Sequence, residues 1–120
     1  MTQAAISPIL DPKILGTGVV VRQRSIDRFA LAHDASHYLL VPDVVLVPET
    51  AEDVAKIFRA THSAKKTLTF RSGGTSLSGQ GVSDSILVDT RSRFQNITVV
   101  DDGKRVCAQP GVTVRKVNAH

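Results

Sequence analysis

The sequence is poor in aromatic residues and cysteine, and it contains no long apolar run. It has four phenylalanines, one tyrosine and no tryptophan among 120 residues, so its core has to be built from valine, isoleucine, leucine and alanine. The single cysteine, Cys107, excludes an internal disulfide and fits a reducing compartment. We expect it to be an inert thiol packed in a core strand. No apolar run approaches the roughly 20 residues that a membrane span requires.

Signals for targeting and for nucleic-acid binding are also missing. The first twelve residues lack a basic region followed by an apolar one, so we expect no secretory signal peptide. These features favour a cytoplasmic protein, with peripheral attachment to a membrane as the alternative. The formal net charge is +4, but the basic residues are dispersed among acidic ones and few aromatic side chains could stack on bases. We therefore expect a solvated surface and no nucleic-acid partner.

The strongest secondary-structure signals begin after residue 41. Residues 44–47 are an apolar, mostly β-branched run between two prolines, which predicts a buried strand. Thr50 and Asp53 have the spacing of a capping box and predict a helix over residues 50–63. Residues 67–70 predict a second strand, and a strand–helix–strand order predicts that the two strands run parallel. The expected apolar stripe of the helix consists of Val54, Ile57 and Phe58.

Residues 1–41 give weaker signals and are expected to form a lead-in that packs on a domain of residues 42–120. Residues 14–21 suit a short extended segment interrupted by glycines. Ser25 is placed to cap a short helix. Three apolar residues after it are spaced to share one face, and these are Ile26, Phe29 and Ala30.

The C-terminal third predicts further strands and a last helix. Residues 86–88 are apolar and predict a strand that ends in Asp89. Residues 97–109 predict a hairpin, because Asp102 and Gly103 at its centre suit a turn with positive φ. Thr113 has the position of a helix N-cap. The sequence given stops about two turns later at His120, and so short a helix is marginal alone, so we expect a longer natural chain.

A glycine- and serine-rich loop at residues 72–81 is the most unusual segment. It holds four of the eight glycines and almost no residue that could fill a core. A glycine backbone can curl so that successive N–H groups point inward and form a concave nest for an anion. Short hydroxyl side chains could donate to phosphate oxygens without crowding them. A flexible linker has a similar composition, but a linker has no purpose between two strands of one domain.

Two common phosphate-binding motifs do not fit this loop. Gly74 and Gly79 have the spacing of the P-loop glycines, but Gln80 stands where that motif requires lysine. The glycines do not follow the dinucleotide-binding pattern, and the loop leads into a strand where that pattern requires a helix. A different kind of nucleotide site is therefore indicated.

The sequence resembles the FAD-binding domain of the vanillyl-alcohol-oxidase (PCMH) type, and especially its D-lactate dehydrogenase and glycolate oxidase branch. The resemblance covers about residues 34–120. Its most specific part is the loop with its flanks, Phe-Arg-Ser-Gly-Gly-Thr-Ser-Leu-Ser-Gly-Gln at residues 70–80. Matching stretches also occur at Asp34, Ser36 and Tyr38, and at residues 42–50, 89–94 and 109–112.

The resemblance implies an α+β fold, in which a small mixed sheet with a covering helix forms the first subdomain of a PCMH-type FAD-binding domain. It implies FAD as cofactor, a 2-hydroxy acid such as D-lactate or glycolate as substrate, and a quinone, cytochrome or iron–sulfur electron acceptor. Some members attach FAD through a histidine directly after two glycines, where this chain has Thr75, so we expect non-covalent FAD. The expected cofactor-binding residues are Pro42, Arg71, Ser72, Gly73, Gly74, Thr75, Ser76, Gly79, Gln80 and Gly111.

The resemblance also implies partners within the same polypeptide, namely a second FAD subdomain, a substrate domain and, in some members, a domain with an iron–sulfur cluster. We assign no catalytic residue to this chain. The alternative is a free-standing nucleotide- or anion-binding module without catalysis. His33 and His37 have a spacing that could share a metal, but no third ligand is evident, and packing or surface roles are favoured. Asp34 is expected to make a turn and Asp89 to end a strand.

Overall fold

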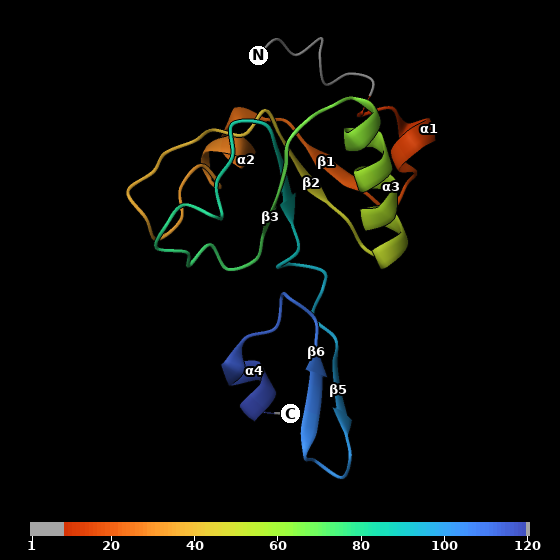
Figure 1. The fold of residues 1–120 in the computed structure, drawn as a ribbon, viewed down its shortest axis with the longest axis vertical. Coiled ribbons are helices and arrows are strands. Elements are labelled where there is room, and N and C mark those ends of the chain that lie inside the picture. Colours follow the sequence, from red (N-terminus) through yellow and green to blue (C-terminus); the bar gives the residue numbers. More distant parts are fainter. Residues whose placement is uncertain (1–8, 120) are drawn as a thin grey trace.

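The computed structural model describes residues 9–119, whose main body is a four-stranded mixed sheet (Figure 1). The strand order is β1–β2–β4–β3, with β1 antiparallel to β2 and the other three strands parallel. This confirms the α+β class with a small mixed sheet. The strands are β1 (Val20–Arg22), β2 (Val44–Val47), β4 (Ile86–Asp89) and β3 (Leu68–Arg71).

The two strands joined by helix α3 (Ala51–Ser63) are parallel but not adjacent, because β4 lies between them. The reason lies in how apolar each strand is. Every residue of β2 and β4 is buried, whereas β3 carries Thr69 and Arg71 as well as two apolar residues and stays partly exposed. A strand that is apolar on both faces is stable only at the centre of a covered sheet, so β4 takes the inner place and β3 the edge.

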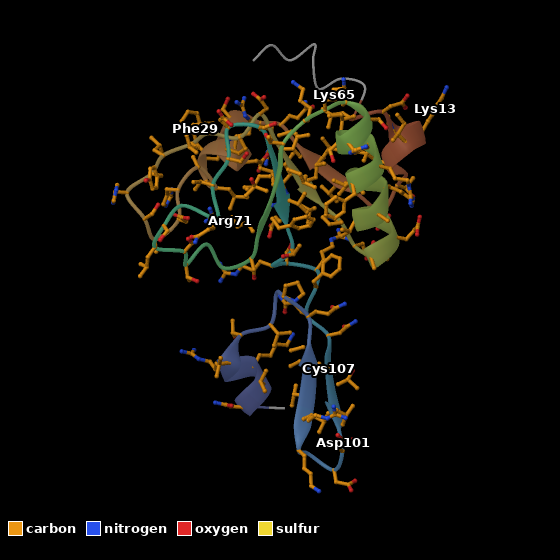
Figure 2. All side chains as sticks on the ribbon, viewed as in Figure 1. Lys13, Phe29, Lys65, Arg71, Asp101 and Cys107 are labelled. Carbon is orange, nitrogen blue, oxygen red and sulfur yellow. The ribbon has the colours of Figure 1, made fainter. Side chains whose placement is uncertain are left out.

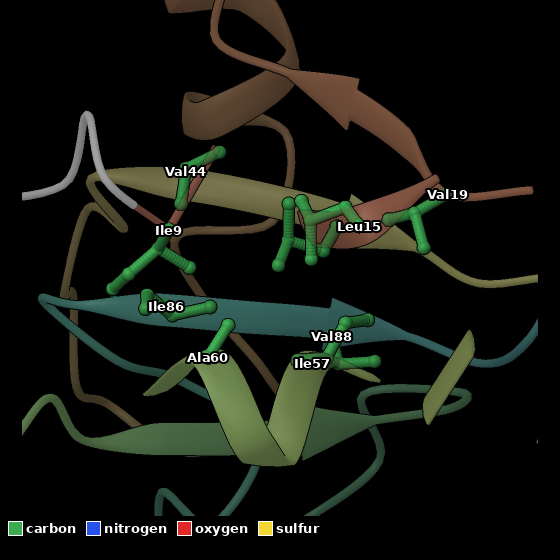
Figure 3. Close-up of a cluster of buried hydrophobic side chains, with 9 residues drawn as sticks. Ile9, Leu15, Val19, Val44, Ile57, Ala60, Ile86 and Val88 are labelled. Atoms are coloured by element: carbon green, nitrogen blue, oxygen red, sulfur yellow. The ribbon is translucent and has the colours of Figure 1, made fainter. Parts of the chain in front are cut away.

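Both faces of the sheet are covered. On one face, α1 (Pro12–Leu15) and α3 pack against side chains of β2 and β4 (Figure 3). On the other face, Val45, Val47 and Leu87 pack against Leu31, which follows α2 (Ser25–Phe29). Residues 9–41 therefore supply a strand and core side chains as well as a cover. The expected boundary at residue 41 stays a prediction, and the part of the lead-in before residue 9 lies outside the described residues.

The capping box of α3 is confirmed, since Thr50 Oγ1 accepts from Asp53 N and Asp53 accepts from Thr50 N. The expected apolar stripe was partly wrong. Ile57 is fully buried, but Phe58 is 52% exposed and its ring lies beside that of Phe70. The helix instead buries the side that carries Asp53 of the capping box. The buried residues on this side are Asp53, Ile57, Ala60 and Thr61.

Two details of the lead-in also differ from expectation. Residues 14 and 15 belong to α1, and the extended segment begins only at Val20. Ser25 is the first residue of α2 and makes no capping bond, because Arg24 occupies the N-cap position. The face of Ile26 and Phe29 is exposed in this chain.

A hairpin of β5 (Ile97–Val100) and β6 (Arg105–Ala108), followed by α4 (Val114–Asn118), lies outside the main sheet (Figure 1). The expected turn is confirmed, with positive φ at Asp101, Asp102 and Gly103. The expectation for Cys107 was wrong, because within residues 9–119 no layer covers β6 and all its residues are exposed. No helix in the described part of the chain has the length and apolar character needed to cross a bilayer.

Candidate functional site

The glycine-rich loop begins at the carboxyl end of β3, where Arg71 is aligned with Asp89 at the end of β4. The chain then leads back to the start of β4, at the opposite end of these two parallel strands. The end of β3 and the loop form an open pocket of about 220 Å³. Its lining consists of Phe70, Arg71, Ser72, Gly73, Gly74, Thr75, Ser76, Gln80 and Gly81.

The loop presents backbone N–H groups that have no acceptor in residues 9–119. Among them, the N–H groups of Gly73, Gly74 and Thr75 follow one another at the first bend of the loop. Gly74 has φ 66°, so the chain passes through the left-handed region at this bend. A left-handed residue at such a bend can turn consecutive N–H groups toward one point, as in an anion nest. Three free donors at one bend fit the oxygens of a pyrophosphate.

Ser76 and Gln80 close the second half of the loop on itself. Ser76 Oγ accepts hydrogen bonds from Ser78 N at 3.2 Å and Gln80 N at 3.1 Å, and its hydroxyl donates to the Gln80 side-chain carbonyl. Ser72 Oγ donates to Pro110 O at 2.5 Å, which ties the loop to the segment after β6. Of the hydroxyls expected to reach phosphate, those of Thr75 and Ser78 make no hydrogen bond within the described residues. The side chains of Ser72 and Ser76 shape the loop, and most of its free donors are backbone N–H groups.

The contacts of Arg71 do not fit the simple role of a positive charge that binds phosphate. Its Nη1 donates to three backbone carbonyls, those of Leu31 at 3.2 Å, His33 at 2.6 Å and Gly81 at 3.3 Å. A Cβ added at Gly74 would lie on top of the guanidinium, 2.6 Å from Cζ. Burial lowers the pKa of Arg71, an effect that the charges of Asp34 and Asp89 oppose. The guanidinium therefore supports the loop from the side of Gly74 where other residues carry a Cβ atom. Figure 2 labels Arg71.

Asp34 makes the expected turn and a second contact that sequence reasoning missed. Its Oδ1 accepts from Ser36 N at 2.9 Å and Ser36 Oγ at 2.5 Å. Its Oδ2 accepts from Gly81 N at 3.2 Å, at the far end of the loop. The Ser36 hydroxyl holds the pKa of Asp34 below its usual value, with Gly81 N and Arg71 acting in the same direction against desolvation. No local pattern could have indicated a bond between residues 47 positions apart.

Three of the ten expected cofactor residues do not line the pocket. Gly79 has φ 79°, and a Cβ there would lie 2.7 Å from the ring of Tyr38. A Cβ at Gly111 would lie 2.5 to 2.9 Å from three backbone carbonyls, so close packing alone requires glycine there. Pro42 is buried, and its carbonyl accepts from Arg28 Nε at 2.6 Å. The other seven residues are brought together, and Phe70 and Gly81 join them unexpectedly.

The contacts of the remaining polar candidates fit structural roles. The His37 ring stacks on Tyr38 with centroids 5.1 Å apart. Asp89 accepts a hydrogen bond from Arg91 N at 2.9 Å, as a residue that ends a strand can do. Within residues 9–119, no three histidine, cysteine, aspartate or glutamate side chains gather as a metal would require. His120 lies outside the described residues.

Comparison with known proteins places this geometry in a family. The sequence model described as FAD binding domain matches residues 42–120. The chain is 38% identical over 98 residues to a D-2-hydroxyglutarate dehydrogenase of Pantoea ananatis, covering 78% of this chain and 10% of that protein. It is 36% identical over 78 residues to the Escherichia coli enzyme of the same name, covering 62% of this chain and 8% of that protein. The chain thus spans about a tenth of the length of these curated relatives.

Solved structures agree on the fold. An alkyldihydroxyacetonephosphate synthase superposes with a TM-score of 0.77 at 17% identity, covering 99% of this chain and 24% of that one. Aclacinomycin oxidoreductase superposes with a TM-score of 0.64 at 24% identity, covering 84% of this chain and 21% of that one. The sequence match, the shared fold and the loop of free N–H donors lead to one conclusion: the chain belongs to the FAD-binding domain family, of the PCMH type.

Proposed function

We propose that this chain is the pyrophosphate-binding part of a flavin-dependent oxidoreductase that oxidises a 2-hydroxy acid. The observation that carries the proposal is the bend at Gly73, Gly74 and Thr75, whose N–H groups have no acceptor within the described residues. Oriented N–H dipoles can bind a diphosphate without a net positive charge beside it. Bound FAD would supply the redox chemistry by taking up the two electrons released as the hydroxy acid becomes an oxo acid.

The role of this chain is to bind and orient the cofactor. In the proposal, the first bend of the loop donates to the pyrophosphate, and the bonds between Ser76 and Gln80 keep the second half of the loop closed. Thr75 follows the two glycines and its hydroxyl cannot form the link that a histidine would form, so FAD is held without a covalent bond. Precipitation of the purified flavoprotein with acid should therefore release all its flavin into the supernatant.

The substrate that we propose is a 2-hydroxy acid, as expected from the sequence, but it differs from the two examples given there. D-Lactate and glycolate were the examples taken from the family resemblance, whereas the curated relatives above are named D-2-hydroxyglutarate dehydrogenases. We therefore propose D-2-hydroxyglutarate as the first substrate to assay. The second FAD subdomain, the substrate domain and the iron–sulfur cluster or other electron acceptor are proposed to belong to a longer protein.

The test is a titration of the chain with FAD beside riboflavin, which has no phosphates, and ADP, which has no flavin. Saturable FAD binding that ADP competes away, with none for riboflavin, is the expected result. Riboflavin binding as tight as FAD binding would contradict the loop assignment. The same titration on the longer natural protein shows whether a second subdomain completes the site.

Anaerobic addition of D-2-hydroxyglutarate to the natural flavoprotein distinguishes between the two hypotheses, an enzyme and a non-catalytic binding module. Loss of the flavin absorbance near its visible maximum is expected for the enzyme. Bound FAD that stays oxidised with every 2-hydroxy acid tested would favour the alternative of a binding module.

A further inference from the structure

Two segments that are far apart in the sequence meet at the glycine-rich loop. One is residues 31–38, between α2 and β2, and the other is residues 71–81, so that they run side by side at the same edge of the molecule (Figure 1). Arg71 Nη1 reaches back to the carbonyls of Leu31 and His33, while Asp34 Oδ2 receives the N–H of Gly81. These bonds join positions 38 to 47 residues apart. The first segment therefore holds both ends of the loop.

The charges of this contact nearly cancel. Arg71 is held against the first bend of the loop by its three carbonyl bonds, and its Nε is buried without a partner among the described residues. Asp34 is buried and brings one negative charge near the guanidinium. A pair of opposite charges adds little net attraction for an anion. What the pair does supply is fixed geometry, because each member bonds to the backbone of the other segment.

We propose that Arg71 and Asp34 are positioning residues that hold the loop in its ligand-ready shape before FAD binds. The proposal rests on the function proposed above. A glycine-rich loop has more conformational freedom to lose than any other segment of this length. Fixing it in advance lowers the entropy cost of binding and so strengthens affinity without a direct contact to the ligand. Tyr38 also helps to fix the loop, because its ring packs against Gly79, where the chain again has a positive φ.

Three substitutions test the proposal in the full-length natural protein: Asp34→Asn, Arg71→Met and Arg71→Lys. The amide of Asp34→Asn has one acceptor oxygen, so either Ser36 or Gly81 would face an N–H group. Arg71→Met removes the charge and the donors. Arg71→Lys keeps the charge but lacks the planar group that lies against Gly74.

The matched controls are Asp27→Asn and Arg93→Met. Asp27 pairs with Arg24 at 2.8 Å, and Arg93 pairs with Glu49 at 3.0 Å, both outside the pocket lining. They remove the same chemical groups from other parts of the surface.

The first readout needs no ligand. Amide hydrogen exchange of the FAD-free protein should become about tenfold faster in a peptide covering residues 76–82 for all three variants, and unchanged in α3 and in both controls. Unchanged exchange at the loop would overturn the proposal even if FAD binds. If wild type binds no FAD, the proposed function fails, while this exchange measurement still decides the positioning role.

The second readout is FAD affinity. We expect a loss of about tenfold or more in all three variants, Arg71→Lys included. Wild-type affinity in Arg71→Lys together with a loss in Arg71→Met would show that Arg71 acts by its charge, and the positioning role would be wrong. If Arg71→Met does not fold, the isosteric Asp34→Asn carries the test, with thermal melting to verify that it is folded.

Discussion

Replacing Gly74 by alanine is the sharpest perturbation of the loop that this structure offers. Gly74 has φ 66°, a conformation that costs an L-residue about 1–2 kcal/mol. Its new Cβ would also lie 2.6 Å from Arg71 Cζ and 2.9 Å from Arg71 Nε, closer than real Cβ contacts allow. Arg71 cannot move aside freely, because three carbonyl bonds hold its guanidinium.

The magnitude follows from these two costs. Displacing the guanidinium weakens hydrogen bonds from a charged donor, each of which contributes about 1.5–3 kcal/mol. Since domains are stable by about 5–15 kcal/mol, the variant should fold and relieve the strain by moving the loop out of its positive-φ bend. Restoring the bend on binding FAD then costs at least the backbone part. A cost of about 1–2 kcal/mol corresponds to an affinity loss of about 5- to 30-fold.

The assay is FAD titration of Gly74→Ala beside Gly103→Ala, with melting curves for both. Gly103 also has a positive φ, of 85°, but a Cβ there would meet nothing within 4 Å. Gly103→Ala should therefore lose about 1 kcal/mol of stability and keep wild-type FAD affinity. Equal FAD affinity in Gly74→Ala and wild type would refute the reasoning, because the bend at Gly74 would then not hold the pyrophosphate.

Three further predictions concern the scaffold of the site. Thr50→Ala should lower the free energy of unfolding by about 1 kcal/mol, measured by urea denaturation, because it removes the acceptor for Asp53 N; no loss would contradict the capping box. Ile57→Ala should cost about 2–5 kcal/mol and Phe58→Ala clearly less, since Ile57 is fully buried and Phe58 is half exposed; melting temperatures in the reverse order would be inconsistent with the packing. Burial alone would raise the pKa of Asp53, but hydrogen bonds from Thr50 and Lys56 outweigh it and hold the pKa below its usual value. The stabilisation by Asp53 is therefore complete above about pH 4 and is lost as the pH falls through the lower folded-state pKa, so Asp53→Asn should flatten the acid limb of a stability–pH curve.

Much of the pocket lining could be predicted because the pattern that indicates it is local. Consecutive glycines and small polar residues after a strand are enough to indicate an anion nest, and seven of the ten expected residues line one pocket. The roles of Gly111 and Pro42 were harder to predict, because glycine and proline occur at closely packed positions as readily as at ligand contacts. The packing of Gly111 against carbonyls of residues 90–94 can be seen only in the folded chain, where the segment after β6 comes back to the segment after β4.

The sequence by itself determined the elements whose signals lie within a few residues: the apolar strands, the capping box at Thr50, the turn at Gly103 and the glycine-rich loop. The hydrogen bonds and steric restrictions that form these elements act between residues a few positions apart, so the local sequence is enough to predict them. Only the tertiary structure decided that β4 lies between β2 and β3, that Cys107 and Phe58 are exposed, and that Arg71 supports the loop. The physical reason is that each of these depends on which distant part of the chain covers a strand or bonds to a backbone group, as Asp34 does when it accepts the N–H of Gly81.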